Sequence, residues 1–402
     1  MNALWSSSKS KRRRLFFISL AVLLILLSAG SLLYALFLSQ TKSGTAVGTS
    51  PIVGHAYFRS SGLISNSSTN GLNDELQLVL SNIPAPAINE SYYLWLLSDA
   101  SIKPTTSISL GRVTVNNGRI NFIFTTPEHR NLIATTSRLL ITEESSNPAP
   151  QEFSRDSHRW RYYAEIPQRT PSPGAPKLGS IRYLRFLVFE SNKMIAQGIH
   201  GGSATLILRN TQKVFEWAGS ARDDWALQQY DLIHRHFIRI LDYVDGSAFV
   251  SADLPPGTPL LTDPQLTQNG LATIVPGENP ESYLPRAAFS ILSFVEAAPN
   301  LSPEKHQLGI QAEHDIRVNI DEHLHLVRAY AKQLVAMDST QLAQKSTLPL
   351  LDSMLEQARI AYSGEYDPTV DRFLGGALND YNDIQLLASY DIAPYIGEQQ
   401  VL

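Results

Sequence analysis

The pattern of apolar and polar positions divides the chain into segments of different character. Residues 15–38, LFFISLAVLLILLSAGSLLYALFL, contain no charged side chain. A helix rises about 1.5 Å per residue, so this run reaches roughly 36 Å and exceeds the ~30 Å hydrocarbon core of a bilayer. A helix of this length in a soluble protein would show a polar face. The pattern therefore predicts a transmembrane helix over residues 15–38.

Positive charge lies mainly on one side of this run. Five cations precede it, namely Lys9, Lys11, Arg12, Arg13 and Arg14. The flank richer in Lys and Arg stays in the cytoplasm. We therefore expect a signal-anchor in the cell membrane, with residues 1–14 as a cytoplasmic basic tail and the bulk of the chain extracytoplasmic. A cleaved signal peptide is the alternative, although its apolar region spans only about 7–15 residues.

Residues 39–53 are small and polar and predict a flexible linker. From residue 54 to 166 the apolar positions instead alternate with a period of two, which is typical of half-buried strands. The run SYYLWLLSD is apolar almost throughout and predicts a central strand with Trp95 buried. Asn116-Asn117-Gly118 between two alternating runs predicts a hairpin. Short strands at this spacing predict an antiparallel β-sandwich over 54–166.

Three motifs within Leu76–Glu144 carry a family resemblance. They are Tyr93-Leu94-Trp95-Leu96-Leu97, Leu110-Gly111-Arg112-Val113 and Leu140-Ile141-Thr142-Glu143. In this order, after a proline-containing loop, they resemble the extracytoplasmic domain of anti-sigma-K factors of the RskA type. The resemblance covers about residues 54–150. A sandwich of another kind is the alternative.

The resemblance implies an outer sensing module but not a sigma-binding protein. Members of that family carry a cytoplasmic domain that grips the sigma factor, whereas here only about 14 residues precede the apolar run. A stable interface needs roughly 20–30 residues a side. The chain is therefore not expected to grip a sigma factor itself.

The C-terminal half shows helical periodicity. A Pro-rich linker at 167–176 separates it from the strands. Residues 177–402 are predicted to form a mainly α-helical domain, with its longest helix beginning at Ser302-Pro303 and further helices over 347–362 and 367–390. A Pro- and Gly-rich loop at 251–285 interrupts it. The predicted fold class is thus α+β and membrane-anchored, with one N-terminal span, an antiparallel β-sandwich and a helical bundle.

Composition narrows the function. The chain has 33 Lys and Arg and 37 Asp and Glu, a net charge of −4; without the five N-terminal cations, 28 bases face 37 acids, a net charge of −9. An acidic ectodomain disfavours nucleic acid as a partner. The absence of cysteine excludes disulfides, thiolate zinc sites and cysteine nucleophiles. A disulfide-free ectodomain is typical of a bacterial protein.

Two groups of residues are candidates for chemistry. Asp321 and His325 are i, i+4 neighbours on one predicted helix, and with His234 they could hold a metal. No H-E-x-x-H, G-x-S-x-G or P-loop motif is present. Asp245, Asp253, Asp263 and Asn269 fit no EF-hand spacing. The aromatic and basic run 155–163 is expected to pack locally, with lipid or glycan contact as the alternative.

These observations predict a single-pass protein with an extracytoplasmic interaction, sensing or scaffolding module, neither an enzyme nor dependent on a cofactor. Its expected partners are the lipid bilayer and an extracytoplasmic or membrane protein. The alternative is a metal-binding extracytoplasmic sensor or enzyme that uses the helical histidines.

Overall fold

The structure is a computed structural model of residues 1–402. It describes residues 51–63, 67–166, 168, 179–190, 192–262, 266–273, 282–298 and 301–397. The chain divides into two compact units, Met1–Pro51 and Ile52–Leu402. All the helices and strands that are described belong to the second unit.

Eight strands form one antiparallel sheet. They are β1 (Gly54–Arg59), β2 (Glu75–Ser81), β3 (Glu90–Ser98), β4 (Ser107–Val113), β5 (Arg119–Thr125), β6 (Thr136–Ser145), β7 (Trp160–Glu165) and β10 (Tyr390–Pro394). Their order is β4-β3-β6-β7-β10-β1-β2-β5. The sheet curls until its two edge strands, β4 and β5, approach each other at the turn that joins them. Strand β10 therefore completes a sheet whose other strands all lie within residues 54–165.

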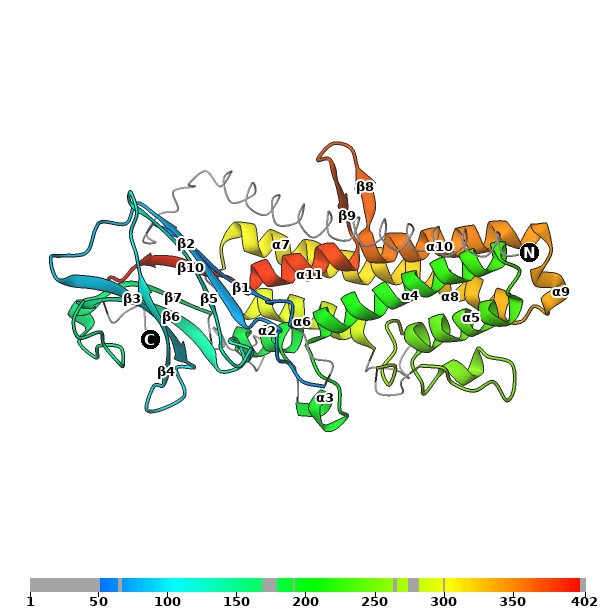
Figure 1. The fold of residues 1–402 in the computed structure, drawn as a ribbon, viewed down its shortest axis with the longest axis horizontal. Coiled ribbons are helices and arrows are strands. Elements are labelled where there is room, and N and C mark those ends of the chain that lie inside the picture. The colour runs from blue at the N-terminus through cyan, green and yellow to red at the C-terminus, as the bar shows by residue number, and fades with distance from the viewer. Residues whose placement is uncertain are drawn as a thin grey trace, which may run out of the picture. The chain divides into compact units, whose positions relative to one another are not determined.

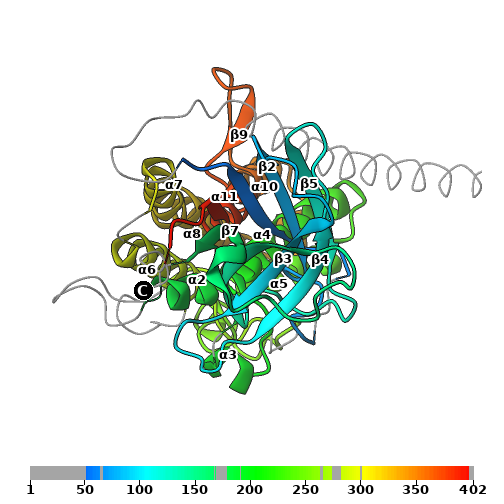
Figure 2. The same ribbon diagram turned by 90° about the vertical axis from the view of Figure 1, so that its left-hand side faces the viewer.

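The helices form a bundle beside this sheet. The described α-helices lie between β7 and β10 in the chain. They are α2 (Ser180–Val188), α3 (Asn192–Ala196), α4 (Ser203–Ala226), α5 (Tyr230–Asp245), α6 (Tyr283–Ala297), α7 (Pro303–His314), α8 (Asp321–Val335), α9 (Ser339–Leu342), α10 (Leu348–Ser363) and α11 (Ala377–Leu387). In Figure 1 the strands of this sheet gather at one end of the helices, and Figure 2 shows the same arrangement from the sheet end. Helix α11 packs on β1 and leads directly into β10.

The two faces of β3 belong to two different cores, which is why the strand is apolar throughout. Tyr92, Leu94 and Leu96 join the large core that continues into the helices. Trp95 faces the opposite way, is fully buried among Tyr163 and other residues, and donates from Nε1 to Thr142 Oγ1 at 2.9 Å. The predicted burial of Trp95 in a central strand is confirmed.

Local end signals place the start of α7 as expected. Ser302 accepts a hydrogen bond from Lys305 N at 3.3 Å and Pro303 opens α7. From there the chain stays helical to Val335, but it widens to a π-helical turn, η3, at Asp315–Ile320. π-Helical turns are rare in proteins, and those that occur often lie at functional sites.

The predicted β-sandwich is wrong. A sandwich has two facing sheets, whereas here every strand of the N-terminal region pairs into one sheet, and β10 from the chain end lies between β7 and β1. The pairing of the Asn116-Asn117-Gly118 hairpin also differs. Asn117 and Gly118 adopt the positive φ of a tight turn, but β4 pairs along its length with β3, and β5 with β2. The turn therefore joins the two edges of the sheet.

The membrane-anchored part of the predicted fold class is corrected as well. Across the residues that the structure describes, no helix combines the length and apolar character needed to cross a bilayer. The predicted span, residues 15–38, and the flanking cations Lys9, Lys11 and Arg12–Arg14 lie outside those residues.

Candidate functional site

A small β-hairpin stands out from the helical bundle. Among the residues that the structure describes, strands β8 (Glu365–Asp367) and β9 (Arg372–Leu374) pair only with each other, and Figure 1 shows them projecting from the helices near α10 and α11. We call β8, β9 and their turn the projecting hairpin, residues 365–374. A two-stranded hairpin is at best marginally stable alone in water. Its persistence therefore needs specific contacts.

Those contacts occur at the turn and across the strands. Asp367 Oδ1 accepts hydrogen bonds from Thr369 N at 2.8 Å and from Thr369 Oγ1 at 2.6 Å. The Tyr366 hydroxyl donates to Asp371 Oδ1 at 2.5 Å. Tyr366 lies directly opposite Phe373, with ring centroids 5.4 Å apart. These contacts fix the register of the strands and the shape of the turn.

Three large apolar side chains of the hairpin face solvent. Tyr366 is 51% exposed, Val370 49% and Phe373 41%. Single exposed apolar residues are ordinary on a protein surface, but a cluster on one short element is typical of a contact surface. The hairpin thus holds apolar groups in a fixed arrangement outside the core.

Glycines allow the hairpin to rise from the bundle at a tight crossing. A Cβ on Gly364 would lie 2.0 Å from Leu374 O, and one on Gly376 would lie 2.2 Å from Gly364 N. Arg359 Nη1 donates to Gly364 O at 3.1 Å, and Asn379 Nδ2 donates to Phe373 O at 2.8 Å. The base of the hairpin is therefore held by α10 and α11.

Asp315 lies beside this base, since a Cβ on Gly375 would lie 3.6 Å from its Oδ1. Its carboxylate acts electrostatically on those of Asp380 and Asp383, and we call these three acids the carboxylate cluster. Asp315 opens the π-helical turn η3 and accepts from Gln311 Nε2 at 2.9 Å and Asn319 Nδ2 at 2.7 Å. A Cβ on Gly375 would lie 2.9 Å from Asn319 Nδ2. The hairpin base thus rests directly on the residues that hold Asp315.

Asp380, on α11, is the most isolated member of the cluster. It is 1% exposed, and among the described residues neither of its carboxylate oxygens has a hydrogen-bond partner. Burial raises its pKa well above the usual value, and the neighbouring Asp315 and Asp383 carboxylates raise it further. A buried carboxyl group without partners is stable only when it is protonated. The surroundings of Asp380 therefore favour its protonated form.

The other two acids are also perturbed. Burial raises the pKa of Asp383 to about 7, while the Arg372 guanidinium on β9 opposes the rise and the Asp315 carboxylate adds to it. Burial likewise raises the pKa of Asp315, against the hydrogen bond from Gln311. The cluster can therefore gain or lose a proton near neutral pH, directly under the hairpin.

The predicted metal candidates are not brought together as a centre. His325 Nε2 lies 3.5 Å from Asp321 Oδ2 on the surface of α8, whereas His234 Nε2 lies 2.6 Å from Met337 O. The described parts of the chain contain no group of three or more His, Asp or Glu residues placed to hold a metal ion.

The acids beside the Pro- and Gly-rich loop have a different role. Asp245 and Asp253 both pair with Arg328, and Asp253 also lies 2.6 Å from Lys332 Nζ. These ion pairs attach the start of the loop to α8. Arg328 and Lys332 are thus the partners of these two carboxylates.

One constellation superficially resembles a hydrolase triad. His129 Nδ1 lies 2.6 Å from Asp74 Oδ2 and 3.3 Å from Ser61 Oγ, while Ser61 Oγ donates to Asp74 at 2.7 Å. A triad needs the acid and the nucleophile on opposite ring nitrogens. Here both contact the same nitrogen, so the arrangement joins loops and does not activate Ser61.

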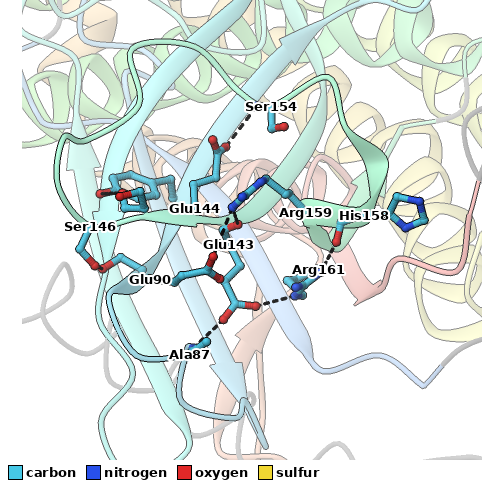
Figure 3. A network of polar contacts seen from close by, with 12 residues as sticks. Ala87, Glu90, Glu143, Glu144, Ser146, Ser154, His158, Arg159 and Arg161 are labelled. Atoms are coloured by element: carbon cyan, nitrogen blue, oxygen red, sulfur yellow. Dashed lines mark hydrogen bonds and ion pairs between the residues drawn. The ribbon is translucent and has the colours of Figure 1, made fainter.

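The aromatic side chains of the run 155–163 pack within the protein, but on residues that are distant in the sequence. Phe153 and Tyr163 are buried with Trp95, and the Trp160 ring lies 5.0 Å from that of Tyr395. Figure 3 shows the accompanying polar network, in which Glu143 accepts from Arg161 Nε at 2.6 Å and from Ala87 N at 2.7 Å. The arginines are thus used in holding loops against the sheet.

A cavity of about 180 Å³ lies between α2, α3, α4 and α6, lined by Phe186, Met194, Tyr283 and Phe289 among others. Ligand pockets usually measure about 300–1,000 Å³. This cavity is small by that measure, and the hydroxyls of its Ser203 and Ser290 already donate to backbone oxygens.

Comparison with known proteins adds no relative, since no family model, no curated protein and no solved structure matches the chain. The functional assignment of the site therefore depends on its geometry alone.

The sequence pattern missed the projecting hairpin, because residues 367–390 were predicted to be one helix. Pro368 and Gly375-Gly376 interrupt that pattern and were the available signals. The acids of α11 gave no comparable signal, since Asp380 and Asp383 look like ordinary polar positions of a helix.

Proposed function

We propose that this protein is a non-catalytic interaction module whose contact element is the projecting hairpin. The observation that carries the proposal is the exposure of Tyr366, Val370 and Phe373 on an element that is separately braced at its turn and its base. Apolar residues held rigidly in solvent lose little entropy when a partner covers them.

The hairpin also favours a class of partner. It carries Glu365, Asp367 and Asp371 against a single cation, Arg372, so its net charge is −2. The outer edge of β9 already makes a hydrogen bond to the bundle, because Phe373 O accepts from Asn379 Nδ2. In the described structure β8 pairs only with β9, which leaves its other edge open for an added strand. The fitting partner is an extended segment with alternating basic and apolar residues.

The resemblance of Leu76–Glu144 to the extracytoplasmic domain of anti-sigma-K factors supports a sensing or scaffolding role. That segment supplies β2 to β6, and its apolar side chains lie in the cores that cover the two faces of the sheet. The metal-binding alternative has no such support, since the histidines named for it are engaged in separate contacts.

The probe that tests this function is a fluorescein-labelled eight-residue peptide of alternating Lys and Val. We expect the full-length chain to raise its fluorescence anisotropy saturably, and a peptide of alternating Glu and Val to bind much more weakly. The double variant Tyr366→Ser/Phe373→Ser removes two anchor side chains and should weaken binding by on the order of tenfold or more.

The matched control is Leu326→Ser, which removes a 39% exposed apolar residue from α8. It should bind the Lys-Val peptide as the unsubstituted chain does. Equal binding of the acidic peptide, or full binding by the hairpin double variant, would show that the hairpin is not the docking element.

A further inference from the structure

The eight-stranded sheet ends in two strand edges that are not closed on each other. In the described part of the chain, β4 pairs only with β3, and β5 only with β2. The turn between β4 and β5 closes with a single bridge from Asn116 to Arg119, beyond which the two strands do not pair. An unpaired edge presents backbone N–H and C=O groups that can add a strand from another chain.

Strand β5 is the less protected of these two edges. Natural sheets usually protect an edge with charged residues, proline or a bulge. Strand β4 carries Arg112 and a register shift against β3, whereas β5 pairs with β2 in an unbroken register and has no charged residue from Ile120 to Phe124. An apolar, regular edge of this kind is a predicted site of association.

The side chains of β5 are also incompletely covered. On its core face Ile120, next to the turn, is only 1% exposed, but Phe122 and Phe124 farther along are only partly buried. On the opposite face Ile123 is 52% exposed. The open edge of β5 therefore lies beside apolar surface that an added strand would cover.

Charge makes this edge complementary to the projecting hairpin. Residues 107–125, from β4 through the turn to β5, contain Arg112 and Arg119 and no acidic residue, so their net charge is +2. Both arginine side chains are exposed, and neither forms an ion pair with a residue that the structure describes. The projecting hairpin has the opposite net charge of −2.

We propose that the projecting hairpin of one copy of this chain docks on the open edge of β5 in a second copy. The open edge of β8 adds to β5, and the acids of the hairpin face the two arginines. Tyr366 and Phe373 lie opposite each other on one face of the hairpin, so the added β8 can continue the face that Phe122 and Phe124 form on β5. The contact names a partner for the docking element, and it therefore rests on the proposed function.

The contact joins two different surfaces, and its strength is limited by its size. Figure 1 shows the hairpin on the helical bundle and β5 in the sheet, so each copy offers one hairpin and one edge, and copies join head to tail. The hairpin contributes residues 365–374, fewer than the roughly 20–30 that a stable interface takes from each partner. The association is therefore weak, and the dilute chain used for peptide binding is monomeric.

Sedimentation velocity of the full-length chain at up to on the order of 100 µM tests the contact. We expect its mean mass to rise with concentration and to fall again in high salt, which screens the charges. Arg112→Glu/Arg119→Glu gives the edge a charge of −2, and Glu365→Lys/Asp371→Asn gives the hairpin +1 while keeping an acceptor for Tyr366. Each variant alone should associate on the order of tenfold more weakly or worse, because like charges then meet.

A mixture of the two variants provides the sharpest test. Each hairpin then meets an edge of opposite charge on the other variant, so the equimolar mixture should associate again. This rescue also shows that both variants are folded. The matched control is Arg182→Glu/Arg235→Glu, which reverses two exposed arginines of α2 and α5 and should associate as the unsubstituted chain does.

An unsubstituted chain that stays monomeric, association that persists in either charge variant, or a mixture without rescue would overturn the inference. Binding of the Lys-Val peptide is a separate readout. Peptide binding by a chain that stays monomeric keeps the docking function and refutes the second copy as its partner. Association with rescue but without peptide binding supports the second copy and refutes the recognition of basic peptides.

Discussion

Substitution of Asp383 by Asn should change how the stability of the whole fold depends on pH. In the folded chain burial raises the pKa of Asp383 from 3.8 to about 7. An acid with a raised pKa contributes stability that is complete below the unfolded pKa of 3.8 and is lost as pH rises through 7. The shift corresponds to about 4 kcal/mol at most, since one pKa unit equals about 1.36 kcal/mol. Asparagine keeps the shape and does not titrate.

Urea unfolding followed by circular dichroism at pH 4.0, 5.5, 7.0 and 8.5 measures the effect. The free energy of unfolding of Asp383→Asn minus that of the unsubstituted chain should become more positive by about 2–4 kcal/mol from pH 4.0 to 8.5. Titrating groups that do not interact with Asp383 cancel in this difference. Asp231→Asn, which neutralises an exposed acid in the first turn of α5, should give a flat difference. A difference for Asp383→Asn that is flat, or that falls with pH, would mean that Arg372 stabilises the ionised form enough to cancel burial, and would refute the reasoning.

Two further substitutions test the fold around the site. Trp95→Ala should lower the free energy of unfolding by about 3–5 kcal/mol in urea titrations, because the side chain is fully buried and bonded to Thr142; a loss below about 1 kcal/mol would contradict its place in the second core. In the folded chain the pKa of Asp391 is lowered to about 2, against the cost of burial, chiefly by Lys305 and His55. Its contribution is therefore present above pH 3.8 and lost as pH falls toward 2, so Asp391→Asn should destabilise the fold at pH 6 and much less at pH 2.

Features set by short segments could be predicted from the sequence. The apolar run around Trp95 indicated a strand buried on both faces, and Ser302-Pro303 indicated the start of α7. Both depend on neighbours within a few residues. The turn at Asn117-Gly118 was indicated for the same reason, since it requires only a positive φ.

Features set by distant pairing could not be predicted in this way. The same turn does not show that β4 pairs with β3 and β5 with β2, because a turn fixes the direction of the chain and not the partner of each strand. Strand β10 joins β1 with a separation of more than 330 residues, as in the pair His55 and Asp391. The burial of Asp380 likewise depends on elements far away in the sequence.

The central claim is that the projecting hairpin is the docking element, and the most direct measurement of it is a footprint. Amide hydrogen exchange of the full-length chain at pH 6.0 is compared with and without saturating Lys-Val peptide. Strand addition should slow exchange at the open edge of β8, within Glu365–Asp367, while α5 and the eight-stranded sheet stay unchanged. Protection confined to another part of the chain, with none in the hairpin, would contradict the account.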